Sequence, residues 1–175
     1  STAQSVDTLD VAVAGVADSP NLSTSAASGN EDSAISLSIS SSLADSSESL
    51  SVVISGVPTG GSLSAGTDNG DGSWTLTSAQ LSNLTITPPS DDASNFSLTV
   101  TATATDGSDT TQSVSTVGVT VAQVADAPTL SANDVTGSED TAISLSLSSA
   151  LSDTDGSESL GVVVSGVPVG SKFSA

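Results

Sequence analysis

The sequence predicts an all-β protein built from tandem antiparallel β-sandwich repeats, with a period of about 108 in residue number. Three observations lead to this fold class. Long segments recur at a fixed spacing, apolar residues alternate with serine and threonine, and turn-forming residues separate the alternating runs. Recurrence at a fixed period indicates repeated structural units, and an apolar period of two indicates half-buried strands rather than helices.

The repeat length comes from paired segments. "VAVAGVADSP" (11–20) recurs as "VTVAQVADAP" (119–128), and "GNEDSAISLS" (29–38) recurs as "GSEDTAISLS" (137–146), both at an offset of 108 (119 − 11 and 137 − 29). "VVISGVPTG" recurs as "VVVSGVPVG" at an offset of 110 (162 − 52), because the later copy carries two extra residues before this segment.

We therefore divide the chain into three parts. Residues 1–19 are the last strand and linker of a preceding repeat, residues 20–127 are a complete repeat, and residues 128–175 are the opening strands of a truncated third one. The chain begins without the basic-then-apolar pattern of a signal peptide, so we expect it to be a piece of a longer array. No apolar run approaches the ~20 residues that a membrane helix needs.

Within a repeat, the alternating runs define the strands in chain order. They are "AISLSIS" (34–40), "LSVVIS" (50–55), "WTLT" (74–77), "LTIT" (84–87), "FSLTVTATAT" (96–105) and "VSTVGVTVAQV" (114–124). Clusters such as "GVPTGG", "DNGDGS" and "TDGSDT" supply turns. Only "TSAQLSNL" (77–84) suggests a helical turn, which we interpret as a crossover between sheets. About seven short strands in a repeat of this length are typical of an immunoglobulin-like sandwich.

The composition excludes several classes of function. The chain has 20 acidic residues, one basic residue (Lys172), no histidine and no cysteine, which gives a formal charge of −19. It therefore offers no cationic surface for a nucleic-acid backbone or an anionic membrane. Serines are abundant, but no histidine can act as their base, so we expect no enzymatic activity. The charge favours a cationic partner, and a metal ion is the simplest one.

The acidic residues gather in loops that a sandwich places at its two ends. One end of the complete repeat should carry Asp45, Glu48, Asp106 and Asp109, next to the linker residue Asp18. The opposite end should carry Glu31, Asp32, Asp91 and Asp92, facing the linker residue Asp126 and a loop of the next repeat with Asp153, Asp155 and Glu158. Glu139 is the counterpart of Glu31 in the truncated repeat. The sequence therefore predicts a junction between neighbouring repeats that is lined by oxygen ligands.

We predict Ca²⁺ as the ion at this junction. Crowded carboxylates repel one another unless a cation neutralises them. Ca²⁺ accepts ~6–8 oxygen ligands in loose geometry, whereas Mg²⁺ requires octahedral ligation and retains water. The loop "DTDGSE" (153–158) carries two closely spaced aspartates and a glycine, but its earlier copy "DSSE" (45–48) lacks the second aspartate and the glycine. We therefore expect the junction at Asp126 to bind more ions, or to bind them more tightly, than the junction ahead of the complete repeat.

A local explanation applies to each acidic loop as well, because aspartate also stabilises turns through hydrogen bonds to its own backbone. We interpret Asp68 and Asp71 in "DNGDG" as hairpin residues, since Asn-Gly and Asp-Gly steps form tight hairpins. Trp74 follows this turn and opens a strand, which indicates a core anchor.

The order of these motifs resembles the cadherins and, more closely, the cadherin-like extender repeats of giant bacterial repeats-in-toxin (RTX) adhesins. The resemblance covers essentially the whole chain, and it is carried by "GNED" and "GSED", "DTDGSE", "GVPTGGSLSAGTDNGDGSWTLTSAQLSNLTITPP", "TATATDGSD" and the linkers "VADSP" and "VADAP". It implies immunoglobulin-like spacers at a bacterial cell surface, which Ca²⁺ and neighbouring repeats hold rigid so that they project a binding domain for adhesion or biofilm formation.

The resemblance also implies roles for individual residues. Glu31 corresponds to an early glutamate ligand, Asp126 to the linker ligand, Asp153 and Asp155 to a pair of aspartates, and Asp106 to a late aspartate. The shortened Asp45 loop and the short linkers depart from the cadherin pattern.

Two other functions stay open on the sequence alone. One is a carbohydrate- or protein-binding immunoglobulin-like module, and the other is a non-catalytic repeat of a secreted hydrolase. A binding module would need an aromatic platform or a concave pocket, and the chain has one tryptophan, two phenylalanines and no tyrosine.

Overall fold

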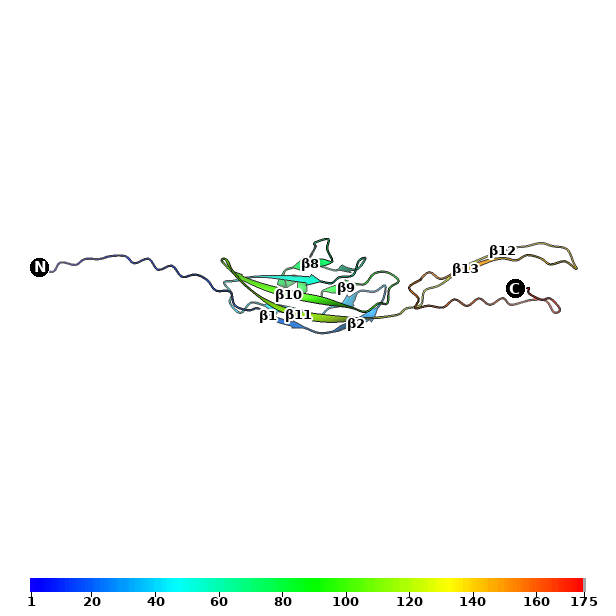
Figure 1. Cartoon of the computed structure of the whole chain (residues 1–175), viewed down its shortest axis with the longest axis horizontal. Coiled ribbons are helices and arrows are strands. Elements are labelled where there is room, and N and C mark those ends of the chain that lie inside the picture. The colour runs from blue at the N-terminus through cyan, green and yellow to red at the C-terminus, as the bar shows by residue number, and fades with distance from the viewer. Residues whose placement is uncertain (175) are drawn as a thin grey trace.

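The computed structural model describes residues 1–174 and has an all-β architecture, as the sequence predicts. Residues 21–122 form a β-sandwich, residues 1–20 extend from one end of it, and residues 123–174 extend from the other (Figure 1). Apart from strands, the regular structure in the described range is a single 3-10 turn. That range contains no helix with the length and apolar character needed to span a bilayer.

One layer of the sandwich is a six-stranded sheet. Its strands, in spatial order, are β2 (Ala27–Asn30), β11 (Asp109–Ala122), β10 (Phe96–Asp106), β5 (Ser49–Ser55), β8 (Ser73–Leu76) and β7 (Thr67–Asp68). Neighbouring strands run antiparallel, with the exception of β2, which runs parallel to β11. The β10–β11 hairpin closes at Gly107, whose φ of 59° is open to glycine without steric cost.

The second layer consists of two smaller sheets. β1 (Asn21–Thr24) pairs with β4 (Ile39–Ser42), and β9 (Thr85–Thr87) lies between β3 (Ile35–Ser36) and β6 (Ser62–Leu63). The turn η1 (Ser78–Leu81) connects β8 in the first layer to β9 in the second, which is the crossover that the sequence predicts.

The predicted strand 34–40 is divided between β3 and β4. The chain changes its hydrogen-bonding partner there: Leu37 N–H donates to Leu84 O (2.9 Å), and Ser38 O then accepts from Ser25 N–H (3.1 Å). Residues 35–42 thus join the two small sheets into one layer.

The core lies between the layers and follows the alternation in the sequence. In β10, Leu98, Val100 and Ala102 are fully buried, whereas Ser97 and Thr99 point outward. Apolar side chains of the second layer cover this face, and Trp74 packs against its margin. Hydrophobic burial between the sheets is therefore the main source of stability in residues 21–122.

Residues 123–174 form a linker and one pair of strands. β12 (Thr129–Asn133) pairs with β13 (Ser146–Ala150) so that Thr129 faces Ala150. β1 and β4 pair in the same register, with Asn21 facing Ser42, and both residue numbers are lower by 108 (129 − 21 and 150 − 42).

The predicted counterpart of β5, residues 160–165, does not form a strand. No counterpart of β8 or β10 lies beside it in the described residues, so its backbone has no partner to pair with. The apolar residues beyond the linker are accordingly more open to solvent: Ile143 is 46% exposed, whereas its counterpart Ile35 in the sandwich is 2% exposed.

Candidate metal centre

Four segments meet at the end of the sandwich from which the linker leaves. β2 ends at Asn30 and continues into Glu31 and Asp32, and the loop before β10 carries Asp91. β11 ends at Ala122 and continues into the linker with Asp126. The loop after β13 supplies residues 151–159 from the far side of the linker (Figure 1). Two groups of carboxylates result, and each could hold a metal ion.

The first group consists of Glu31, Asp153 and Asp155. One carboxylate oxygen of each residue lies within 4.8 Å of the corresponding oxygens of the other two. Glu31 and Asp153 are each only 1% exposed. The group therefore combines a residue of the sandwich with two residues from beyond the linker, and two of its three carboxylates are removed from water.

Glu31 also holds the linker. Its backbone N–H donates to Ala122 O (3.0 Å), and its side-chain Oε1 accepts a hydrogen bond from Val124 N–H (2.6 Å). The second oxygen, Oε2, is buried and has no hydrogen-bond partner. A buried carboxylate oxygen without a donor is costly, because it has lost its water and gained nothing in exchange.

The loop that carries Asp153 and Asp155 is shaped by hydrogen bonds to these two side chains. Asp153 Oδ1 accepts from Asp155 N–H (2.8 Å), and Asp153 Oδ2 accepts from the Ser157 hydroxyl (3.1 Å). Gly156 takes a φ of 95°, which glycine adopts readily. The loop thus turns both carboxyl groups toward the sandwich.

Asp155 binds across the junction. Its Oδ1 accepts from Ser157 N–H (2.6 Å), and its Oδ2 accepts from Ala93 N–H (3.1 Å) in the loop before β10. Hydrogen bonds from the side chain and backbone of Ser157, followed by the one from Ala93, lower the pKa of Asp155. Asp155 therefore stays ionised, as a metal ligand must.

The second group consists of Asp32, Asp91 and Asp126, whose nearest carboxylate oxygens again lie within 4.8 Å of one another. Asp32 and Asp91 have φ values of 56° and 53°, in the left-handed region that non-glycine residues seldom occupy. Asp91 N–H donates to Asp32 Oδ1 (3.0 Å). Partial desolvation raises the pKa of Asp91, and the charges of Asp32 and Asp126 raise it further.

Glu158 binds the linker from the other side. Its Oε1 accepts a hydrogen bond from Asp126 N–H, and its Oε2 is buried without a partner. Glu48 repeats this contact at the opposite end of the sandwich, where its Oε1 accepts from Asp18 N–H (2.5 Å) and its Oε2 is likewise unpartnered. The two glutamates are counterparts, since each ends the acidic loop of its own repeat.

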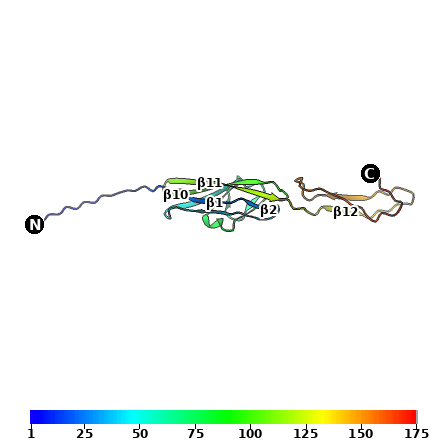
Figure 2. The same ribbon diagram turned by 90° about the horizontal axis from the view of Figure 1, so that it is seen from below.

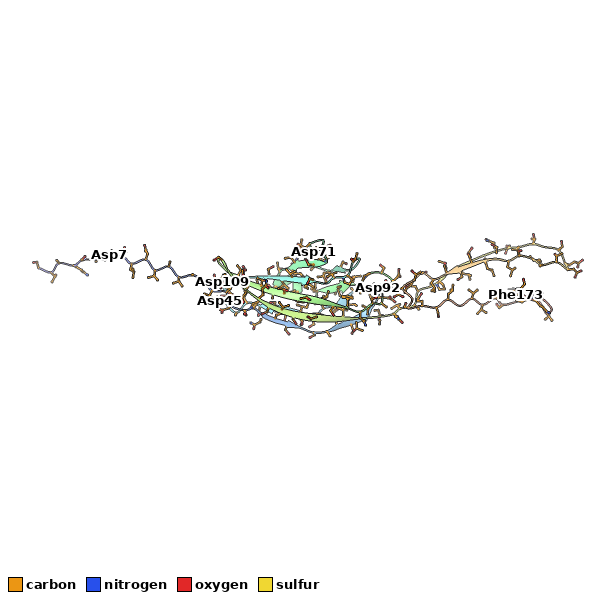
Figure 3. The ribbon with its side chains drawn as sticks, viewed as in Figure 1. Asp7, Asp45, Asp71, Asp92, Asp109 and Phe173 are labelled. Atoms are coloured by element: carbon orange, nitrogen blue, oxygen red, sulfur yellow. The ribbon has the colours of Figure 1, made fainter. Side chains whose placement is uncertain are left out.

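The other predicted ligands belong to neither group of carboxylates. Asp45 and Asp109 are at the far end of the sandwich, whereas Asp92 is at the linker end (Figure 3). Asp92 Oδ1 accepts from Ser94 N–H (2.9 Å), and it belongs to neither group, although the sequence gives it the same standing as Asp91.

The far end has contacts of its own with the segment before β1. Asp109 Oδ2 accepts from Ala17 N–H (3.0 Å), and the Asp106 carboxylate lies against Gly15. Asp45 is exposed and accepts from Ser47 N–H (2.9 Å), which lowers its pKa. No group of three ligand-type residues forms at this end among the described residues.

Glu139 is exposed and joins neither group. Its neighbour Asp140 nevertheless has a φ of 60°, like its counterpart Asp32. Asp68 and Asp71 accept hydrogen bonds from Gly70 and Ser73 within their own hairpin, which agrees with the prediction of turn residues.

Sequence reasoning did not identify the donors that hold these carboxylates. Val124, Ala93 and Asp126 contribute backbone N–H groups, which have no signature in the sequence. The turn at Asp155 could have been anticipated, because an aspartate side chain commonly accepts a hydrogen bond from the backbone N–H two residues on, which is that of Ser157 here.

Every side chain of the two groups is an oxygen ligand, and no basic side chain lies among them. Lys172 is the single basic residue of the chain, and it lies beyond β13. The donor set and the unpartnered Oε2 of Glu31 both fit a metal cation. Comparison with known proteins gave no match, either to a protein-family model or to a curated protein.

Proposed function

We propose that this chain is a structural extender module of a bacterial surface adhesin, in which Ca²⁺ bound at the junctions between immunoglobulin-like repeats makes the array rigid. The observation that carries the proposal is the Glu31 side chain. It is 1% exposed, one of its oxygens has no partner, and Asp153 and Asp155 from across the linker lie beside it.

A cation at this position would resolve an electrostatic conflict. Seven carboxylates, counting both groups and Glu158, surround one short linker. Like charges at these distances destabilise a compact junction, and buried ones do so most strongly. Since the chain supplies no arginine or lysine there, a metal ion is the available counter-charge.

Ca²⁺ suits this set of ligands better than other common ions. Carboxylate oxygens are hard ligands, which favours Ca²⁺ or Mg²⁺ over the transition metals that prefer histidine and cysteine. Ca²⁺ also tolerates irregular geometry with ~6–8 oxygens, as loops from two separate units would provide.

Three structural equivalences support the tandem arrangement. β12 and β13 pair in the register of β1 and β4, with residue numbers higher by 108 (129 − 21). Asp140 adopts the left-handed conformation of Asp32. Gly137 lies against Ile143 as Gly29 lies against Ile35. These likenesses support the proposal that residues 128–174 are the start of a second copy of the sandwich formed by residues 21–122.

The mechanism is thermodynamic linkage between ion binding and alignment of the repeats. An ion that binds only the folded, aligned junction stabilises it by about 2.7 kcal/mol per site when its free concentration is a hundredfold above Kd. Extracellular modules often bind Ca²⁺ at ~10⁻⁴–10⁻³ M. Millimolar Ca²⁺ is a one- to tenfold excess over such a Kd, which contributes about 0.4–1.4 kcal/mol per site. At the much lower free Ca²⁺ of the cytosol the contribution is close to zero, so the array is stiffer outside the cell than inside it and stays flexible before export.

Thermal unfolding of the whole chain tests the proposal. We expect the melting temperature to rise with millimolar Ca²⁺, to rise much less with Mg²⁺, and to fall back when a chelator is added. The variant Asp155→Asn should lose most of the Ca²⁺ response. Asp68→Asn, which changes an aspartate of the hairpin turn instead, should keep it. An unchanged melting temperature in Ca²⁺ would contradict the proposal.

A further inference from the structure

Within the six-stranded sheet, the strand that comes first in the chain (β2) lies beside the strand that comes last (β11), and the two run in the same direction. β2 pairs with β11 in parallel, with Ala27 facing Val119 and Asn30 facing Ala122. The chain enters the sandwich at one end and leaves it at the other, in both views of the molecule (Figures 1 and 2). A force that stretches the chain therefore pulls β2 and β11 in opposite directions along their own axes.

This arrangement decides how the load is shared. Backbone hydrogen bonds join neighbouring strands across the strand direction, and in a parallel pair they are evenly spaced and slanted. When two parallel neighbours are pulled past each other, all the bonds between them are strained together. When two strands are peeled apart from one end, the bonds are strained one at a time and yield in sequence. Shear along β2 and β11 is thus the geometry that resists force best.

Glu31 extends this contact beyond the strands. Its backbone N–H donates to Ala122 O, and its side chain accepts from Val124 N–H, so it bonds to the chain at the point where β11 becomes the linker. Both bonds join the end of β2 to the exit of the sandwich. β1 adds a second sheared contact, since it lies antiparallel to β4 over four residue pairs from Asn21 to Thr24.

We propose that the β2–β11 pair is a mechanical clamp: it carries tension applied between the two linkers, and Glu31 fastens its far end. The sandwich is thereby a load-bearing unit, which is a function beyond that of a spacer. The clamp consists of protein contacts only, so it acts without any bound ion.

Single-molecule pulling in two directions tests the clamp. The chain has no cysteine, so pairs of introduced cysteines define the points of attachment. Ser19→Cys with Gln123→Cys pulls along the clamp. Ser47→Cys with Ser108→Cys pulls two exposed positions at the same end apart, and so peels β5 from β10, starting where Ser49 faces Thr105. All measurements are made in chelator, which separates their outcome from that of the calcium proposal.

We expect unfolding at equal force to be at least about tenfold slower along the clamp than in the peeling direction, which corresponds to about 1.4 kcal/mol in the barrier. Equal rates in the two directions would overturn the proposal.

A pair of proline variants locates the resistance. The backbone N–H of Glu31 points toward β11, and the backbone N–H groups of alternate residues in a strand point to the same neighbouring strand. The N–H of Ala27 therefore also points toward β11, whereas that of Ser28 points away from it. Ala27→Pro should accelerate unfolding about tenfold along the clamp and far less in the peeling direction. Ser28→Pro, on the same edge strand, should change either rate little. If Ala27→Pro accelerates both directions equally, the clamp does not exist.

Discussion

Glu31 joins three structural roles in one side chain. It follows the last residue of β2, it accepts a hydrogen bond from the linker at Val124, and it presents a buried, unpartnered oxygen to Asp153 and Asp155. A buried negative charge without a counter-charge opposes folding, and the same charge favours folding once a cation is bound. The sign of its contribution therefore depends on the ion.

The variant Glu31→Gln should show this change of sign. The amide oxygen can still accept from Val124, but the charge is gone. In chelator we expect the melting temperature to rise, because about 1–3 kcal/mol of desolvation penalty is relieved. We also expect the variant to bind Ca²⁺ about tenfold more weakly than the wild type. Calorimetric titration and thermal melts measure the two effects, and Glu139→Gln, at the exposed counterpart position, should show neither. A decrease in stability under both conditions would argue against this role.

Asp91 and Asp155 should contribute to the acid dependence of the junction in opposite directions, because the pKa of Asp91 is raised and that of Asp155 is lowered. Partial desolvation and the charges of Asp32 and Asp126 raise the pKa of Asp91 above the ordinary value of 3.8. The folded state then binds a proton more tightly than the unfolded state, so the Asp91 contribution improves as the pH falls through the raised pKa toward 3.8.

Melting curves in chelator between pH 7 and pH 4 measure this dependence. We expect the wild type to gain stability relative to Asp91→Asn as the pH falls. A constant difference between the two proteins across this range would mean that Asp91 does not sense its neighbours.

Sequence reasoning located the candidate ligands to a loop but not to a residue. Asp91 and Asp92 are adjacent and chemically identical, and the left-handed backbone at Asp91 decides which of them faces Asp32 and Asp126. That conformation depends on the hydrogen bond from Asp91 N–H to Asp32, a contact between residues far apart in the chain. The sequence around Asp91 gives no sign of this distant contact.

At the level of elements, alternation predicted most strands because burial on one face imposes it. β10 (Phe96–Asp106) follows the predicted run 96–105 closely, whereas β11 (Asp109–Ala122) begins five residues earlier and ends two residues earlier than the predicted run 114–124. The division into β3 and β4 was not predictable, since it arises where the chain exchanges β9 for β1 as its partner. The failure of residues 160–165 to form a strand has the same origin. Their sequence matches β5, but a strand also needs a neighbour.

Gly29 in β2 shows how tightly the two layers meet. A Cβ atom at this position would lie 2.7 Å from Ile35 Cγ1, well inside van der Waals contact. We expect Gly29→Ala to destabilise the sandwich by about 1–3 kcal/mol through overpacking. Gly118→Ala in β11 is the matched control, because nothing lies within 4 Å of the added atom, and it should stay within about 0.5 kcal/mol. Denaturant unfolding measures both, and similar losses for the two variants would contradict the packing explanation.

The loop after β13 should set the ion-binding strength of its junction. Deleting Asp155 and Gly156 converts "DTDGSE" into a loop of the same length as "DSSE". The deletion removes one ligand of the first group and the bond to Ala93, but it retains Asp153 and Glu158. We expect calorimetry to show about tenfold weaker Ca²⁺ binding or one ion fewer. Unchanged stoichiometry and affinity would mean that the insertion is incidental to binding.

At the scale of the whole molecule, the acidic residues within the sandwich (residues 21–122) and those of the adjoining linkers gather at the two ends of the sandwich. Asp68 and Asp71 in one hairpin are the acidic exceptions on the flanks of the sandwich, and Figure 3 shows Asp71 there, away from both ends. Repulsion is therefore concentrated where neighbouring units meet, and this is where a cation acts most strongly.

Small-angle X-ray scattering should detect the consequence. We expect the chain in chelator to show a broad range of orientations of residues 128–174 relative to the sandwich, and in Ca²⁺ a narrower, more extended distribution. The variant Asp126→Asn should respond less than the wild type, since it lacks the linker ligand of the second group. Identical scattering with and without Ca²⁺ would mean that ion binding does not align residues 128–174 with the sandwich.

The outward face of the six-stranded sheet is covered by hydroxyl groups such as those of Ser51, Thr99 and Thr116, all exposed and uncharged. Such a coat stays well hydrated without carrying a fixed charge. If such chains are anchored side by side, as the proposed function implies, their uncharged sheet faces repel one another less than their acidic ends do, which favours close lateral packing even though each molecule is a strong polyanion.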